Sequence, residues 1–226
     1  MEEHQVYSSK AFSDSDRLNE ANVTIFKRMR NLPAYEQFNE TIKMQRKAKD
    51  KQEIILQGLE TLTGLRTRVE IELKDTIKQI EKIKYPNRSS SDMQAKLYGQ
   101  MLVNKAHQDF SVKPKDIHEK LKTALELKEN EYIFEIRDLY VNDEKTTDLD
   151  KAKVRNFVNE LEELLNLPEI ENRKNNLDAE LIQVRRYFEL LDETPELYEA
   201  EIDKSVKVAK IMYENGQFEG SSILLS

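Results

Sequence analysis

Apolar residues recur every three or four positions along most of this chain, which is the spacing of one face of a helix. The longest such pattern lies between Pro33 and Pro86 and takes eight steps over 28 residues, a mean of 3.5. Its members are Ile55, Leu59, Leu62, Leu65, Val69, Leu73, Ile77, Ile80 and Ile83. This pattern predicts a long helix or a helical hairpin with a coiled-coil-like seam. The seam packs either against another chain or against the first arm of the hairpin, and Leu62, Val69 and Leu73 are its candidate partner-binding residues.

Two features of this segment argue against a regular dimeric zipper. Leu65 falls one position early for a strict heptad repeat. Gly58 and Gly64 each cost a helix about 1 kcal/mol relative to alanine. Glycines at these positions are therefore candidates for a bend or for close packing between helices.

Shorter apolar patterns follow the turn-forming residues 85–91. Ser91 with Gln94 forms a capping box for a helix whose apolar residues are Met93, Leu97, Met101 and Leu102. Asp116 with Glu119 predicts the capped start of a second helix. Residues 141–147 predict a loop. Two further helices are predicted to end near Pro168 and Thr194. Prolines 33, 86, 114, 168 and 195 separate these helices, which is typical of antiparallel helix pairs stacked in a solenoid.

The last segment, from residue 195 onward, predicts one helix and a tight turn. Thr194 suits the N-cap and Pro195 the first helical position, and Gly216 can close the helix with a positive φ. A second helix that folds back after this turn would leave apolar residues partly uncovered, and such an edge is prone to bind a partner. This arrangement is typical of a helical-repeat array whose last repeat is incomplete. The alternative is an ordinary helical hairpin. These candidate partner-binding residues are Phe218, Ile223, Leu224 and Leu225.

Together these patterns predict an all-α protein, with a long N-terminal helix or helical hairpin followed by a stack of antiparallel helix pairs. We expect a flexible arm at residues 1–20 and a coiled-coil-like segment at 21–88. We expect a helical-repeat domain at 89–226, truncated at its C-terminal edge. The 35% content of charged residues, with only five glycines and five prolines, favours the same fold class.

Net charge is −7 but is divided unevenly along the chain. Residues 1–88 hold 17 Lys and Arg against 14 Asp and Glu, whereas residues 89–226 hold 19 against 29. The acidic part is therefore unsuited to general nucleic-acid binding. A basic run in the first part is the candidate for phosphate or RNA contact, and a solvated helix face is its alternative. It consists of Lys43, Arg46, Lys47, Lys49 and Lys51.

The sequence carries none of the residue patterns that support catalysis or cofactor binding. It has no cysteine, no Gly-rich phosphate loop and no serine in a nucleophile elbow. His4, His107 and His118 are too scattered for a metal-ligand motif. We therefore expect no enzyme activity, no cofactor and no metal. Because no apolar run nears the roughly 18 residues of a membrane span, and no signal peptide is visible, we expect a cytoplasmic protein.

Two resemblances bear on function. Residues 213–219 resemble the turn of a tetratricopeptide repeat, where aromatic residues flank a glycine. Residues 188–191, 202–203, 209–210 and 213–220, and more weakly 102–103, 110–113, 119–120 and 137–140, resemble the helical-repeat region of the e subunits of eukaryotic translation initiation factor 3. Those subunits belong to the PCI family of scaffold proteins, whose helical repeats precede a winged helix. The first 90 residues have no counterpart in the resemblance, and neither does a winged helix.

The resemblance implies a non-enzymatic scaffold subunit that binds other protein subunits, with a role in translation initiation. The alternative is a coiled-coil structural protein that acts through residues 35–85. An enzyme is the least favoured hypothesis, because the chain lacks a recognisable catalytic constellation.

Overall fold

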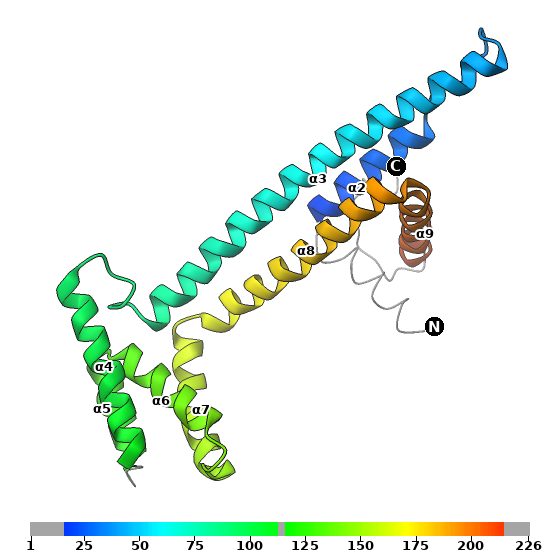
Figure 1. Cartoon of the computed structure of the whole chain (residues 1–226). Coiled ribbons are helices and arrows are strands. Elements are labelled where there is room, and N and C mark those ends of the chain that lie inside the picture. Colours follow the sequence, from blue (N-terminus) through cyan, green and yellow to red (C-terminus); the bar gives the residue numbers. More distant parts are fainter. Residues whose placement is uncertain (1–15, 113–115, 215–226) are drawn as a thin grey trace. The chain divides into compact units, whose positions relative to one another are not determined.

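The computed structural model describes residues 16–112 and 116–214, and over these ranges the chain forms eight helices and no strand (Figure 1). The helices are α2 (Asp16–Arg30), α3 (Glu40–Lys84), α4 (Met93–Val112), α5 (Ile117–Glu126), α6 (Asn130–Asn142), α7 (Asp148–Leu164), α8 (Leu167–Glu193) and α9 (Pro195–Glu214). The prediction of an all-α protein is confirmed. The pattern between Pro33 and Pro86 forms one long helix, α3, rather than a hairpin.

The chain divides into two compact units. Unit 1 comprises Met1–Leu73 together with Asn176–Ser226, and unit 2 comprises Lys74–Asn175. Helices α3 and α8 each contribute residues to both units. This division does not coincide with the boundary expected at residues 88 and 89.

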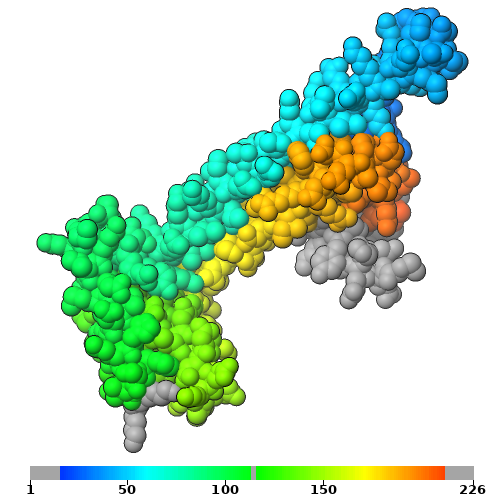
Figure 2. Space-filling view, viewed as in Figure 1, coloured from blue at the N-terminus to red at the C-terminus, as the bar shows by residue number. Residues whose placement is uncertain are grey.

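The core of unit 1 is formed by α2, α3, α8 and α9. Figure 1 shows α2 and the C-terminal part of α8 running alongside α3, and Figure 2 shows side chains of α3 and α8 in contact along this part. The core is mostly aliphatic, with two tyrosines where α8 meets α9. Its buried members are Leu18, Ile25, Phe26, Met29, Ile54, Leu62, Leu65, Val69, Leu177, Leu181, Val184, Tyr187, Leu191, Tyr198 and Ile202.

The coiled-coil-like seam of α3 is part of this core. Leu62 and Val69 are fully buried against helices of the same chain, and Leu73 packs against them partly buried. Further along α3, Ile80 and Ile83 pack against the core of unit 2 instead. The structure thus places the three candidate partner-binding residues of the seam inside the protein rather than on an exposed surface.

Helix α2 begins within the segment expected to be a flexible arm. Residues 16–20 are helical, and Leu18 is completely buried. The Arg17 guanidinium donates two hydrogen bonds to Glu72 of α3 and two to Glu180 of α8, with the shortest N–O distance 2.7 Å in each pair. Such bidentate pairs are the stronger kind of charged hydrogen bond. The prediction of an arm at residues 1–20 is therefore wrong for residues 16–20.

Gly58 lies where three helices of unit 1 approach one another. A Cβ atom added there would lie 2.8 Å from Leu191 Cδ2 and 3.2 Å from two side-chain carbons of Ile25. The same addition at Gly64 would meet nothing within 4 Å. Of the two glycines of α3, only Gly58 is required by close packing.

The core of unit 2 surrounds α6, which contacts α4, α5 and α7. Tyr132, Ile133, Phe134 and Ile136 are consecutive or nearly so in α6, and all four are completely buried. A helix that buries residues on every side must be covered on every side. Helix α6 is therefore the central element of this unit.

Residues 85–91 form the predicted turn, and a buried carboxylate fixes it. Glu131, in the first turn of α6, is completely buried and accepts hydrogen bonds from the Asn87 backbone N–H (2.5 Å), the Asn87 side chain (3.1 Å) and the Arg88 backbone N–H (3.4 Å). The helix that follows is capped by Asp92, whose carboxylate accepts from the backbone N–H groups of residues 94 and 95. The capping box predicted at Ser91 is therefore replaced by a cap one residue later.

The remaining turns match the sequence only in part. The loop predicted at residues 141–147 is present as residues 143–147, and Thr147 caps α7 by accepting from the Asp150 backbone N–H. The turns before α6 and α8 use Lys128 and Asn166 in the left-handed region, at φ 58° and 54°. Asp116 precedes α5 but makes no side-chain capping bond. The predicted turn at Gly216 lies outside the described residues.

Candidate protein-interaction surface

Helix α4 in unit 2 has apolar residues on two opposite faces. Its packed face consists of the buried residues Gly99, Leu102, Val103 and Ala106, and α6 is the helix that α4 contacts most. Its other face exposes Met93, Leu97 and Met101, with 68%, 61% and 65% of their surfaces accessible. These three residues are four positions apart and therefore line up along one side of the helix. We call them the α4 stripe.

The sequence predicted Met93, Leu97, Met101 and Leu102 as the apolar residues of this helix, and the structure places Leu102 on the packed face and the α4 stripe on the exposed one. The small residues Gly99 and Ala106 flank Leu102 on the packed face, which allows α4 to lie close to its neighbours. A Cβ atom at Gly99 would lie 3.1 Å from the Arg88 backbone nitrogen, so the turn at residues 85–91 also occupies this face. The larger Met93, Leu97 and Met101 are consequently turned toward solvent.

The polar residues around the α4 stripe are amides and cations. Gln94, Gln100 and Asn104 lie beside it, and Gln100 donates to Asn104 at 3.3 Å. Lys96 is exposed, and the first acidic residue within α4 is Asp109, near its end. Within α4 the stripe is thus flanked by neutral and basic residues, and the Asp92 carboxylate at its N-terminal end is engaged in capping the helix.

Buried acidic residues hold α4 in place. Glu129, which is 6% exposed, accepts from the Tyr98 hydroxyl at 3.2 Å and from Lys105 Nζ at 2.9 Å. Burial, and then the charge of Glu129 and the hydrogen bond to it, raise the pKa of Tyr98. The phenol therefore remains a donor at neutral pH. These contacts fix the rotation of α4 about its axis and so keep the α4 stripe exposed.

The candidate phosphate contacts on α3 do not form one uniform basic patch. Lys51 pairs with Glu199 of α9 at 2.6 Å, and Lys43 pairs with Glu40 at 3.4 Å. The Arg46 guanidinium lies 4.1 Å from the centre of the Phe38 ring. Lys47 and Lys49 are exposed. The run is therefore divided between ion pairs, a cation–π contact and solvated side chains, which weakens its case as a phosphate-binding surface.

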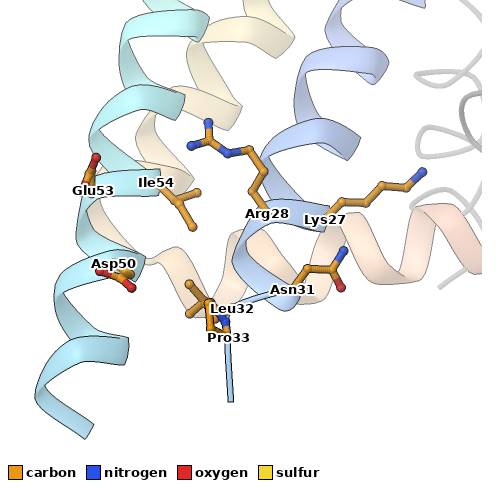
Figure 3. A pocket seen from close by; sticks show the side chains of 8 residues that line it. All are labelled: Lys27, Arg28, Asn31, Leu32, Pro33, Asp50, Glu53 and Ile54. Atoms are coloured by element: carbon orange, nitrogen blue, oxygen red, sulfur yellow. The ribbon is translucent and has the colours of Figure 1, made fainter. Parts of the chain in front are cut away.

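A shallow hollow of about 410 Å³ lies beside the end of α2 in unit 1 (Figure 3). Two cations of α2, Arg28 and Lys27, and two carboxylates of α3, Asp50 and Glu53, line this hollow. Arg28 donates to Gln57 at 2.6 Å, and Lys27 points away from α3. Because charges of both signs line the hollow, charge alone selects neither an anionic nor a cationic ligand.

The other predicted site residues are placed as follows. Phe218, Ile223, Leu224 and Leu225 lie outside the described residues. His107 contacts Glu135 at 3.0 Å, and His118 stacks edge-on against Phe157. In the described ranges no group of three or more His, Asp or Glu side chains could hold a metal ion. Within the same ranges, no helix combines the length and apolar character needed to cross a membrane.

The apolar residues of the α4 stripe are predictable from the sequence, but their exposure is not. Its three residues were recognised as apolar and helical, yet helical spacing alone cannot tell which of two apolar faces is buried. The available signal was the row of small and branched residues at 99, 102, 103 and 106, which is the better packing face.

No protein-family model, curated protein or solved structure matches this chain.

Proposed function

We propose that this protein is a non-enzymatic scaffold subunit that binds other protein subunits through the α4 stripe. The observation that carries the proposal is the exposure of three aligned apolar side chains on a helix whose opposite face is already packed. Single exposed apolar residues are ordinary, whereas aligned ones form a patch that a partner can cover.

The α4 stripe has the properties of a helix-binding face. Residues spaced by four fit the grooves of a second helix, and fully covering each such side chain stabilises a complex by about 1.5–3 kcal/mol before the costs of association. Methionine side chains adapt to differently shaped partners. The partner that fits best is an amphipathic helix with acidic residues beside its apolar face, since Lys96 adjoins the stripe and α4 offers no acid there.

The helical architecture supports the same class of function. Short turns connect α5 to α6 and α7 to α8, as in proteins built from helix pairs. We extend the proposal to a tetratricopeptide-like, PCI-type arrangement of the helices and to a role in cytoplasmic translation initiation. Only the sequence resemblance supports this extension. The coiled-coil alternative loses support, because the seam of α3 is occupied by helices of the same chain.

The test is affinity purification of the tagged full-length chain from its source cell, with two matched variants. The first replaces Met93, Leu97 and Met101 by glutamine, which keeps side-chain length and helix propensity. The control replaces Leu149 and Leu164 of α7 by glutamine; these two residues are comparably exposed, but they lie at opposite ends of α7, about 22 Å apart along its axis, and so form no continuous patch. A partner lost with the first variant and retained with the control supports the proposal.

The same experiment separates the narrower hypotheses. Ribosomal small-subunit proteins among the partners lost would support the translation-initiation assignment. Recovery that falls after nuclease treatment, and equally in both variants, would instead favour an RNA contact through the basic run of α3. Identical partners for the wild type and the α4 variant would overturn the proposal.

A further inference from the structure

Unit 2 contains a groove of about 720 Å³ that is independent of the α4 stripe. Its apolar wall is made by Ile117 and Leu121 of α5 and Val154 of α7. The loop at residues 143–147 closes one side. Ligand sites for small organic molecules commonly have volumes of roughly 300–1,000 Å³, with apolar walls and a few polar groups. The groove falls within that range.

One buried polar group faces this groove without a partner. Tyr140 of α6 lines it and is only 4% exposed, and no hydrogen bond joins its hydroxyl to any residue of the described ranges. The Tyr140 ring is fixed by an edge-on contact with Phe110 at 5.2 Å. Its hydroxyl is not among the fully enclosed unpaired atoms, so a molecule in the groove can reach it. The hydroxyl is therefore a free donor at the wall of the groove, and the acceptor oxygen of a ligand can take the place of solvent there.

Electrostatics near Tyr140 indicate which kind of acceptor fits. Burial, and then the charges of Asp150 and Asp109, raise the pKa of Tyr140. The same negative charges disfavour an anionic group at the hydroxyl and favour a neutral acceptor such as a carbonyl oxygen. The phenol stays protonated at neutral pH and can donate to it.

The positive charges of the groove lie at its rim. Lys145 belongs to the loop, and Lys153 of α7 lies 3.9 Å from Asp150. The loop is braced, because the Asp143 carboxylate accepts from Thr146 Oγ1 (2.7 Å) and from the Lys145 backbone N–H (3.2 Å). The two lysines therefore stand on a preformed frame rather than on a segment that must order first.

We propose that this groove binds a small organic anion with an apolar body. The body lies between Ile117, Leu121 and Val154, a neutral oxygen accepts from Tyr140, and the acidic group lies at Lys145 and Lys153. Each part of the ligand corresponds to one observed feature of the groove. The apolar wall takes the body, the unpaired phenol takes the oxygen, and the cationic rim takes the charge.

The test uses a matched pair of probes, coumarin-3-carboxylate and its neutral ethyl ester. Both contain an apolar bicycle and a ring carbonyl, and they differ in the negative charge. Binding to the full-length chain is followed by NMR of labelled Ile, Leu and Val methyl groups. The expected result is a set of shifts at Ile117, Leu121 and Val154, with the anion bound about threefold to tenfold more tightly than the ester, as for a partly exposed charge contact.

Two variants divide the contributions. Tyr140→Phe removes only the hydroxyl and should weaken both probes by about fivefold, the loss of one neutral hydrogen bond. The double variant K145M/K153M should abolish the preference for the anion and leave ester binding unchanged. The control K96M/K122M removes two exposed lysines of the same unit that do not line the groove, and should change neither. Circular dichroism verifies that all variants remain folded.

Several results would overturn the proposal. One is the absence of methyl shifts at the groove at millimolar probe. Another is a set of shifts centred on Leu97, which would locate binding at the α4 stripe. Equal effects of the two lysine variants would show that the preference reflects overall charge rather than the rim.

Discussion

The two units of this protein are built from the chain in different ways. Unit 2 is continuous from Lys74 to Asn175, whereas unit 1 joins residues from both ends of the sequence. In unit 1, Tyr198 of α9 donates to the side-chain oxygen of Asn22 of α2 at 2.9 Å, across 176 positions of sequence. Contacts between distant residues must overcome a larger loop-closure entropy than local ones. Unit 1 therefore depends on both chain ends, and unit 2 on neither.

The cores also differ in chemistry. Unit 1 is mostly aliphatic, with Arg17 joining three of its helices at the edge of the core. Unit 2 centres on Tyr132, Phe134 and Tyr140, and it buries two acids whose oxygens accept from turns and neighbouring helices. Its turns are thus specified by side-chain hydrogen bonds. Both candidate binding surfaces lie in this unit, where rigid turns hold exposed groups in place.

Deleting residues 1–31 should separate the two units most strongly. The deletion removes α2, and with it Leu18, Ile25, Phe26 and Met29 from the core of unit 1. Each buried side chain of this size contributes about 1.5–3 kcal/mol, so the four together contribute about 6–12 kcal/mol, which is comparable with the total stability of a typical domain, about 5–15 kcal/mol. We expect unit 1 to unfold, and hydrogen exchange of α9 to become fast.

In the same variant, unit 2 should keep its protection. Hydrogen exchange of α4, α6 and α7 serves as the internal reference, because none of these helices contributes to the unit 1 core. Fast exchange in α6 as well would mean that the two units unfold together and that unit 2 also depends on the chain ends.

In unit 2, Glu131→Ala should be the most damaging single change. It leaves the backbone N–H groups of Asn87 and Arg88 and the Asn87 amide without their acceptor. Leaving a buried donor unpaired costs about 1–3 kcal/mol; because Asn87 is half-buried and Arg88 is exposed, water can replace part of the lost bonding, and we expect a total loss of about 3 kcal/mol in the free energy of unfolding. Urea denaturation monitored by circular dichroism measures it.

The matched variant is Glu135→Ala, one turn further along α6. Among the described residues Glu135 makes one side-chain hydrogen bond, to the exposed His107, so we expect a loss below about 1 kcal/mol. A similar loss for both variants would show that the turn at residues 85–91 does not depend on the buried carboxylate.

The sequence predicted which segments form helices much better than it predicted which helices pack against one another. The 3.5-residue spacing of α3 gave the helix correctly, because amphipathic periodicity is a local property of the chain. It could not reveal that Leu62 and Val69 pack against α2 and α8, since those contacts join distant segments. The same limit applies to α4, where periodicity identified apolar residues without showing which face is covered.

Turns were predictable only where glycine, proline or a capping residue marks them. Residues 85–91 carry such signals and form the turn expected of them. Lys128 and Asn166 adopt positive φ without glycine, which a sequence pattern does not indicate. The groove beside Tyr140 was not predicted, because it is made by α5, α6, α7 and a loop that only the tertiary structure brings together.

The two glycines of α3 provide a smaller and sharper test within unit 1. Gly64→Ala should stabilise the protein by about 1 kcal/mol, because it improves helix propensity and meets no neighbour. Gly58→Ala has the same propensity gain but pushes against Leu191 and Ile25, and overpacking of this kind costs about 1–3 kcal/mol. We expect a net loss of about 1 kcal/mol by thermal denaturation. Stabilisation by both variants would contradict the close approach at Gly58.

The smallest expected effect is a pH dependence at Asp109 in unit 2. Burial alone would raise the pKa of Asp109, but hydrogen bonds from Lys120 and Tyr132 outweigh it and lower the pKa. The folded state therefore binds this proton more weakly than the unfolded state does. The resulting stabilisation is fully present above the ordinary aspartate pKa of about 3.9 and is lost as the pH falls through the lowered value.

Asp109→Asn removes this titrating group and should weaken the charged hydrogen bond with Lys120, at a cost of about 1 kcal/mol at pH 7. The measurement is the free energy of unfolding at pH 6 and at pH 3. The wild type should lose more stability than the variant between these two values, because only the wild type must protonate Asp109. Lys120→Met, which removes the partner instead, should reduce the pH dependence in the same direction. An equal loss of unfolding free energy between pH 6 and pH 3 in all three proteins would mean that the Asp109–Lys120 pair does not stabilise unit 2. The polar contacts that stabilise unit 2 would then be those of the buried acids at positions 129 and 131.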